Sequence, residues 1–142
     1  MKIRIVSSRD EIAQLDPEER VVHLTICPTT IVLLELIKRC PKLDAVQIAP
    51  FQFRNMSKSN MGFLEVQGVK IFEGLIQGYR TDMNEYRTID DGLILQRAEE
   101  LRVEGLDSEE IVAKVAREVE VSPGLVGFIL DSRLRLTSPQ RF

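Results

Sequence analysis

The residues best suited to a chemical or binding task lie between Asp107 and Leu136, close to the end of this 142-residue chain. Two helix-start signatures fall within the stretch. Glu110 follows Asp107 at the spacing of a capping box, and Pro123, which favours the first helical position, follows Ser122 directly. The sequence therefore predicts two helices joined by a very short break.

Apolar residues around that break have the spacing of a helix-turn-helix, the motif that places a recognition helix in the major groove of duplex DNA. They are Val115, Ala116, Val119, Val121, Val126 and Ile129. We expect the two helices of the motif at about 109–119 and 123–134. A further helix is expected at about 91–104, with Thr88 as its cap, and it completes a tri-helical unit.

The tri-helical unit contains seven candidates for contact with DNA. Side chains in the first turns of a recognition helix reach base edges, whereas cations at its end and on the preceding helix reach phosphates. The candidates are Lys114, Arg117, Ser122, Gly124, Phe128, Arg133 and Arg135. Among the residues of the first turns only Ser122 has a hydrogen-bonding side chain. The motif therefore predicts the helix-turn-helix fold more strongly than it predicts recognition of a DNA sequence.

Two features weaken the case for a DNA-binding helix-turn-helix. Glu120 stands at the turn position where glycine is usual, which predicts a left-handed backbone at a non-glycine residue. The charge balance also has the wrong sign for a phosphate partner. Residues 1–74 carry ten Lys and Arg against nine Asp and Glu, whereas residues 75–142 carry nine against thirteen, so the half with the motif is acidic.

A protein partner is the second interpretation of the last helix. Gly124 and Gly127 are small residues at a three-residue spacing, which lets two helices approach closely, and the neighbouring Phe128 can fill a groove. The pattern predicts an interface in a homodimer or with another protein. Burial of these residues inside the monomer is the alternative.

Four β-rich segments in the first half of the chain share an apolar pair, and the pairs recur every 21 to 23 residues. They are Ile3 and Ile5, Leu24 and Ile26, Val46 and Ile48, and Val69 and Ile71. This spacing predicts a parallel β-α repeat sheet, and the simplest arrangement has sequential strand order with the helices on one face. A doubly wound order is the alternative. The expected fold class is α/β: a small parallel four-stranded β-α repeat sheet followed by a tri-helical helix-turn-helix-like unit.

Helices between the strands are expected at 30–39 and from a cap at Ser57 or Ser59 to Gln67, the second ended by Gly68. Residues 50–57 are expected to form a loop. Two glycines and an uneven polar pattern mark the boundary that follows. We assign residues 1–74 to a parallel β-α repeat domain, 75–88 to a linker and 89–142 to the helical domain.

The other face of the predicted sheet is mostly polar. If the apolar pairs face the helices, this face carries Lys2, Arg4, His23, Thr25, Gln47, Lys70 and Phe72. A parallel sheet is normally covered on both sides. We therefore expect this face either to pack within the molecule, or to meet solvent, or to bind a partner.

A small-anion-binding regulator is the third interpretation. Ser7, Ser8, Thr29 and Thr30 lie at the starts of predicted helices, where parallel strands end, and backbone N–H groups at such ends can hold an anion. Ser and Thr are also the preferred N-caps, so the same residues are explained without a ligand.

Catalysis, a metal and a cofactor are not predicted. The glycines lack the flanking pattern of a phosphate loop, and the single histidine, His23, lies within a predicted strand. Cys27 and Cys40 do not approach metal-ligand spacing and fit small buried residues. No run approaches the ~18 apolar residues of a membrane span, and no secretory signal is visible. We therefore expect a cytoplasmic protein without a membrane partner.

Three stretches of the chain carry a resemblance to a known family: VVHLTICPTT, LIKRCPKLDAVQIAP and VSPGLVGFILDSRL. Over most of its length the chain resembles a family of archaeal proteins of unknown function, chiefly from methanogens. The tri-helical part is also similar to the helix-turn-helix fold of many prokaryotic regulators and recombinases. The resemblance implies a cytoplasmic archaeal protein and no activity. We expect a non-enzymatic protein of transcription regulation, with duplex DNA as its partner.

Overall fold

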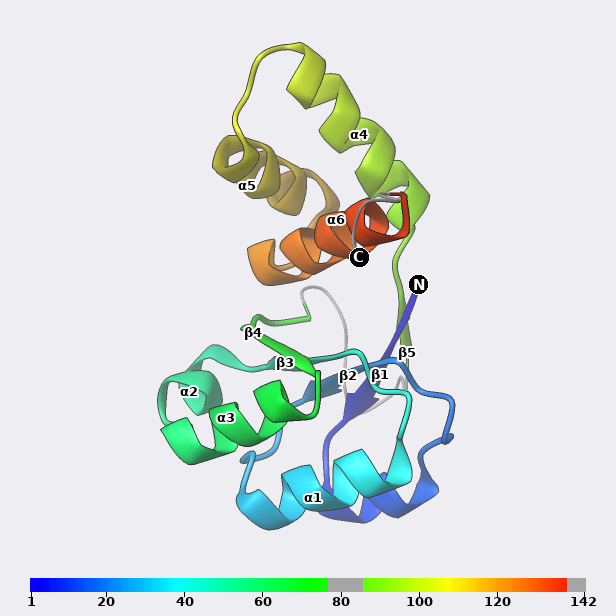
Figure 1. Ribbon diagram of the computed structural model, residues 1–142, viewed down its shortest axis with the longest axis vertical. Helices are drawn as coiled ribbons and strands as arrows, with labels where there is room; N and C mark the ends of the chain where they lie inside the picture. Colours follow the sequence, from blue (N-terminus) through cyan, green and yellow to red (C-terminus); the bar gives the residue numbers. More distant parts are fainter. Residues whose placement is uncertain (77–85, 138–142) are drawn as a thin grey trace. The chain divides into compact units, whose positions relative to one another are not determined.

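The computed structural model describes residues 1–76 and 86–137, of which 133–137 are described by their backbone alone (Figure 1). Contacts divide the chain into two compact units. One spans Lys2–Ile89 and contains the sheet. The other consists of Met1 and the residues from Asp90 onwards, and it contains the helices of the second half.

The sheet has five strands within the described residues, in the order β4-β3-β2-β1-β5 (Figure 1). The predicted parallel strands in sequential order are confirmed for the first four, whereas the predicted total of four is wrong, because a fifth strand joins the edge antiparallel to β1. The strands are β1 (Lys2–Val6), β2 (Val21–Leu24), β3 (Ala45–Ile48), β4 (Lys70–Glu73) and β5 (Tyr86–Thr88).

Strand β5 lies in the stretch assigned to a linker, so that assignment is wrong for its last residues. Tyr86 is opposite Arg4 in the register, and the Arg4 guanidinium carbon lies 5.4 Å from the centre of the tyrosine ring. The Tyr86 hydroxyl donates a hydrogen bond to the Glu19 carboxylate, 67 positions away. A three-residue strand held by such distant partners has no local pattern by which the sequence would show it.

Helical segments connect the parallel strands: η1 (Arg9–Gln14, a 3₁₀ helix), α1 (Thr30–Arg39), α2 (Pro50–Arg54) and α3 (Lys58–Val66). The predicted helices at 30–39 and 57–67 are confirmed. The Ser57 hydroxyl oxygen accepts from the Asn60 N–H at 3.1 Å, and Gly68 ends the second helix with a φ of +77°. The predicted loop at 50–57 is wrong, because Pro50 presets the φ of a first helical position and starts α2.

One face of the sheet carries the main apolar core. Strand residues on this face form one buried cluster with residues of the connecting helices. The cluster includes Val6, Val22, Leu24, Val46 and Ile48 from the strands, and Leu33, Leu36 and Leu64 from α1 and α3. The helices therefore lie on one face of the sheet, as predicted (Figure 1).

Strand β1 has the opposite phase to the predicted one. Its register pairs Arg4 with Val22, a residue of the main core. Partners on neighbouring parallel strands point to the same side, so Arg4 and Val6 face the helices, and Ile3 and Ile5 lie on the other face. Both isoleucines are nevertheless buried. In a strand that is covered on both faces, an apolar pair therefore predicts that its residues are buried. It does not predict which of the two faces packs against the helices.

The second unit packs three helices around its own core: α4 (Asp91–Val103), α5 (Ser108–Val119) and α6 (Pro123–Thr137). These match the predicted positions to within a turn. Thr88 is not the cap of α4, as predicted, because it belongs to β5; the Asp90 carboxylate instead accepts from the Leu93 N–H at 3.0 Å. The largest fully buried side chains of this core are Ile94, Leu101 and Leu125.

The face of the sheet that was predicted to be polar contains a buried polar pair. His23 and Gln47 are register partners on β2 and β3, with exposures of 2% and 0%. The Gln47 amide nitrogen lies 2.9 Å from His23 Nδ1. An amide nitrogen can only donate, so Nδ1 accepts, and the imidazole is neutral with its proton on Nε2. Burial lowers the pKa of His23 to about 4.

This pair predicts a specific loss of stability in acid. Above pH 6.5 the imidazole is neutral in both states, whereas between pH 6.5 and about 4 only the unfolded chain binds the proton. The free energy of unfolding should therefore fall by roughly 3 kcal/mol over that window, in addition to any loss from carboxylates. Urea unfolding at pH 7 and pH 4.5 measures it.

The matched control is His23→Gln, which keeps a polar side chain but cannot titrate near neutrality. Its stability should depend less on pH than that of the parent. Because His23 is the only histidine, the ring signals of the folded protein should also remain those of a neutral imidazole at pH 5 by NMR. Equal pH dependence in both proteins would contradict the prediction.

Candidate nucleic-acid interface

The break between α5 and α6 has the geometry that a helix-turn-helix needs. Glu120 ends α5 in the left-handed conformation, with φ 56° and ψ 46°, as its place in the sequence predicted. The Val121 N–H then reaches the Ala116 carbonyl at 3.1 Å, which closes the end of α5. One residue later, Ser122 begins the next helix.

Both helix starts are capped as predicted. The Asp107 carboxylate accepts from the Glu110 N–H at 2.9 Å, and the Glu110 carboxylate accepts from the Asp107 N–H at 3.3 Å, which is a complete capping box. The Ser122 hydroxyl oxygen accepts from the Leu125 N–H at 3.1 Å. Of the six predicted inter-helix positions, all except the half-buried Val119 are buried.

The candidate reading residues do not form a base-reading surface. Ser122 is only 6% exposed, and its hydroxyl oxygen is engaged in capping α6. Gly124 and Phe128 are half-buried and offer no hydrogen-bonding side chain. The side of α6 that meets solvent in its first two turns therefore consists of Pro123, the glycines and part of an aromatic ring.

Gly127 lies on this side of α6 with space around it. A Cβ built at that position meets no atom within 4 Å. Among the described residues nothing therefore requires a glycine here for packing, and the predicted close approach of a second helix stays a prediction.

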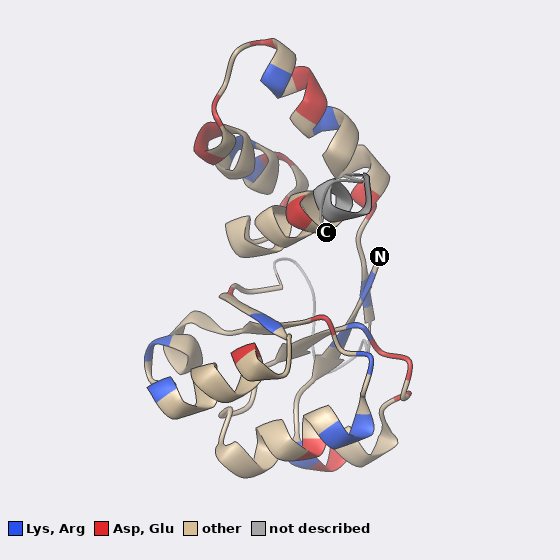
Figure 2. Cartoon of the chain, viewed as in Figure 1, with Lys and Arg blue, Asp and Glu red and all other residues tan. Residues whose placement is uncertain are grey.

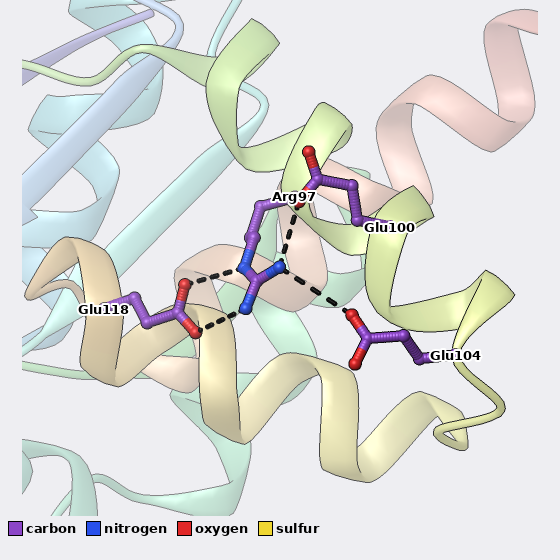
Figure 3. Close-up of polar contacts among 4 residues, drawn as sticks. All are labelled: Arg97, Glu100, Glu104 and Glu118. Carbon is purple, nitrogen blue, oxygen red and sulfur yellow. Dashed lines mark hydrogen bonds and ion pairs between the residues drawn. The ribbon is translucent and has the colours of Figure 1, made fainter.

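The arginines of α4 are held by glutamates, in an arrangement that sequence reasoning did not identify. Arg97 bonds both carboxylate oxygens of Glu118 on α5, at 2.8 and 3.3 Å, and it also binds Glu100 and Glu104 of its own helix end (Figure 3). The spacing of Arg97 and Glu100 is visible in the sequence. The link to Glu118 requires α4 and α5 to be packed side by side.

A second pair completes the charge pattern of α4. Arg102 and Glu99 are joined on the same helix. Their hydrogen bond lowers the pKa of the Glu99 carboxyl and raises that of the guanidinium. Both α4 arginines therefore have glutamate partners, and Figure 2 shows basic and acidic positions close together along this helix.

The cations of α5 are placed differently. In the described part of the chain, the side chains of Lys114 and Arg117 form no ion pair and no hydrogen bond. The hydrogen bond and charge of Arg97 lower the pKa of the Glu118 carboxyl, and the charges of Lys114 and Arg117 act in the same direction. Arg133 and Arg135 belong to α6, but their side chains lie outside the described residues.

The four anion candidates are engaged within the first unit. The carboxylate of Glu11 accepts from the N–H groups of both Ser7 and Ser8, so an internal anion already occupies that helix start. The Thr29 hydroxyl oxygen accepts from the Val32 N–H, and the Thr30 hydroxyl donates to Asn60. These contacts are the ones that N-capping requires, and they leave the four residues explained without a ligand.

Metal and thiol chemistry find little support in the described residues. No group of three or more His, Cys, Asp or Glu among them is placed to hold a metal ion. Cys40 is buried as predicted, and burial raises the pKa of its thiol to about 11, whereas Cys27 is exposed, against the prediction. Within the same residues, no helix has the length and apolar character needed to cross a membrane.

The left-handed turn predicts a stabilising substitution. Replacing Glu120 by glycine removes a backbone strain of about 1–2 kcal/mol, offset in part by the larger freedom of glycine in the unfolded chain. Glu120→Gly should raise the free energy of unfolding by roughly 0.5–1 kcal/mol in urea unfolding. Glu120→Gln is the control, because it removes the charge and keeps the strain. A glycine variant less stable than the parent would contradict this interpretation.

Comparison with known proteins agrees with the division of the chain. Residues 2–85 match a family model described as the N-terminal domain of a family of unknown function (DUF1699). Residues 94–131 match a second model, described as the C-terminal HTH domain of the same family. No curated protein and no solved structure matches the chain. The two models cover most of the sequence, which confirms the resemblance to a family of unknown function, and the chain belongs to the DUF1699 family.

Proposed function

We propose that this chain is a non-enzymatic regulatory protein whose helix-turn-helix unit binds duplex DNA, mainly through the phosphate backbone. The observation that carries the proposal is a difference between two adjacent helices in whether their cationic side chains form ion pairs. The arginines of α4 are neutralised by glutamates, whereas Lys114 and Arg117 of α5 form no ion pair with a described side chain. Because Arg97 of α4 also balances the carboxylate of Glu118 on α5, the negative charge beside Lys114 and Arg117 is smaller than the count of α5 glutamates suggests.

The fold of the unit supports the same proposal. In a helix-turn-helix complex the recognition helix enters the major groove while other parts of the unit touch the backbone. Phosphate contacts fix the position of a protein on the duplex and supply most of its non-specific affinity. Two cations on the helix that precedes α6 are suited to that role, and the description of the matching C-terminal family model as an HTH domain is compatible with it.

The proposal predicts a salt dependence of known size. Two phosphate contacts give a slope of about −2 for the logarithm of the binding constant against that of the salt concentration, and about −4 if Arg133 and Arg135 join them. Affinity should thus fall roughly tenfold to hundredfold between 50 and 200 mM salt. Fluorescence anisotropy with a labelled duplex measures both values. Absence of binding at 50 mM salt would overturn the proposal.

A matched pair of variants tests which arginine makes the contact. Arg117→Gln should weaken DNA binding and make the slope less steep by about one. Arg102→Gln removes the same charge from α4, where the guanidinium is already held by Glu99, and should change binding less. Equal losses would show that only net charge matters, and would contradict the assignment of the contact to α5.

A homodimer formed through α6 is the second candidate. The observation in its favour is the uncharged side of the helix, where Pro123, Gly124 and Gly127 permit close approach and where a Cβ at Gly127 meets nothing within 4 Å. Two copies of an uncharged patch can meet around a two-fold axis without like-charge repulsion.

The dimer predicts a concentration-dependent mass. In analytical ultracentrifugation the parent should approach twice the monomer mass as concentration rises, whereas Gly127→Glu, which places a carboxylate in the contact, should remain a monomer. Gly127→Ala is the control, because it adds volume without charge. A parent protein that stays monomeric at every concentration would exclude this candidate.

A further inference from the structure

The first turns of α6 lack every side chain that direct reading of a base sequence uses. Sequence is read mostly by Arg, Lys, Asn and Gln, which pair with base edges in the major groove. Within the described residues, α6 contains none of these four types from Pro123 to Ser132. Ser122, the remaining polar residue at its start, is buried and caps the helix.

The other residues of these turns are placed for packing. Leu125, Val126 and Ile129 are buried in the core of the unit. The positions turned to solvent are Pro123 and, in part, the two glycines and Phe128, so the helix backbone itself would face much of the groove. Asp131, the first exposed charged residue of α6, comes more than two turns after the helix start, and its charge is repelled by phosphate.

We infer that the helix-turn-helix unit binds duplex DNA without regard to base sequence. The inference rests on the proposed DNA binding and specifies its target: the phosphate backbone and the groove shape common to all duplexes. A good pair of hydrogen bonds to a base edge changes affinity roughly fivefold to hundredfold, and this surface provides none. Phe128 offers this surface apolar contact with thymine methyl groups, which adds no hydrogen bond to a base edge.

The structure also indicates how sequence reading can be added. Gly127 lies in the turns that would face the groove, and a Cβ there meets no atom outside its own helix backbone within 4 Å, so a side chain can be attached without a clash at its first carbon. Glutamine is uncharged, favours helix and forms a pair of hydrogen bonds with adenine. Gly127→Gln should therefore create a sequence preference without increasing attraction to phosphate.

The test uses three labelled duplexes of equal length and equal base composition whose base order is permuted. Fluorescence anisotropy at 50 mM salt with the full chain should give dissociation constants within about threefold of one another. Gly127→Gln should separate the same duplexes by fivefold or more, whereas Gly127→Ala, the control, should not.

The outcomes separate this inference from the proposed function. A parent that discriminates more than tenfold among the duplexes would overturn the inference and leave DNA binding intact. If both the parent and Gly127→Gln bind the three duplexes with equal affinity, the placement of the α6 surface against the bases is overturned. No binding to any duplex would overturn the proposed function and the inference together.

Discussion

Between α5 and α6 the backbone has to change direction within three residues while both helix ends keep their hydrogen bonds. Glu120 makes this possible by adopting a left-handed conformation, at a cost that glycine would avoid. The turn brings the Val121 N–H to the Ala116 carbonyl and leaves Ser122 to satisfy the Leu125 N–H. Because Ser122 has to cap the helix, it is withdrawn from the surface. The short turn that forms the motif thus makes Ser122 unavailable for reading a base, although Ser122 was the best candidate for that role in the sequence.

In the helical unit, the contacts between charged side chains decide which cations have a carboxylate partner, and the composition alone does not show this. The sequence shows an acidic half, which argues against a phosphate partner. In the folded unit the Arg97 guanidinium bridges α4 to Glu118 of α5, so part of that negative charge is balanced inside the structure (Figure 3). Lys114 and Arg117 then differ from the α4 arginines by their lack of a described carboxylate partner. This difference, rather than the net charge, governs the proposed interaction with DNA.

The sheet shows how far alternation of side chains can be interpreted. The apolar pairs predicted four parallel strands in sequential order, because each unit of a β-α repeat has the same pattern of apolar residues. The pair Ile3 and Ile5 nevertheless pointed to the wrong face, since strand β1 is buried on both sides and Arg4 faces the helices. His23 and Gln47 also lie at positions that alternation predicted to be polar, and they are buried. Burial is possible because the two side chains form a hydrogen bond with each other.

Local patterns in the sequence by itself determined the helix starts at Asp107 and Ser122, the left-handed residue Glu120 and the parallel strand order. They also showed that the first turns of α6 have few side chains able to read a base. Each depends on neighbours within a turn or on a short repeat, such as Asp107 with Glu110. Tertiary structure alone decided the fifth strand, the phase of β1 and the partner of Arg97, because these join residues far apart in the chain. Tyr86 reaches Glu19 across 67 positions and Arg97 reaches Glu118 across 21, and no local spacing specifies such a pair.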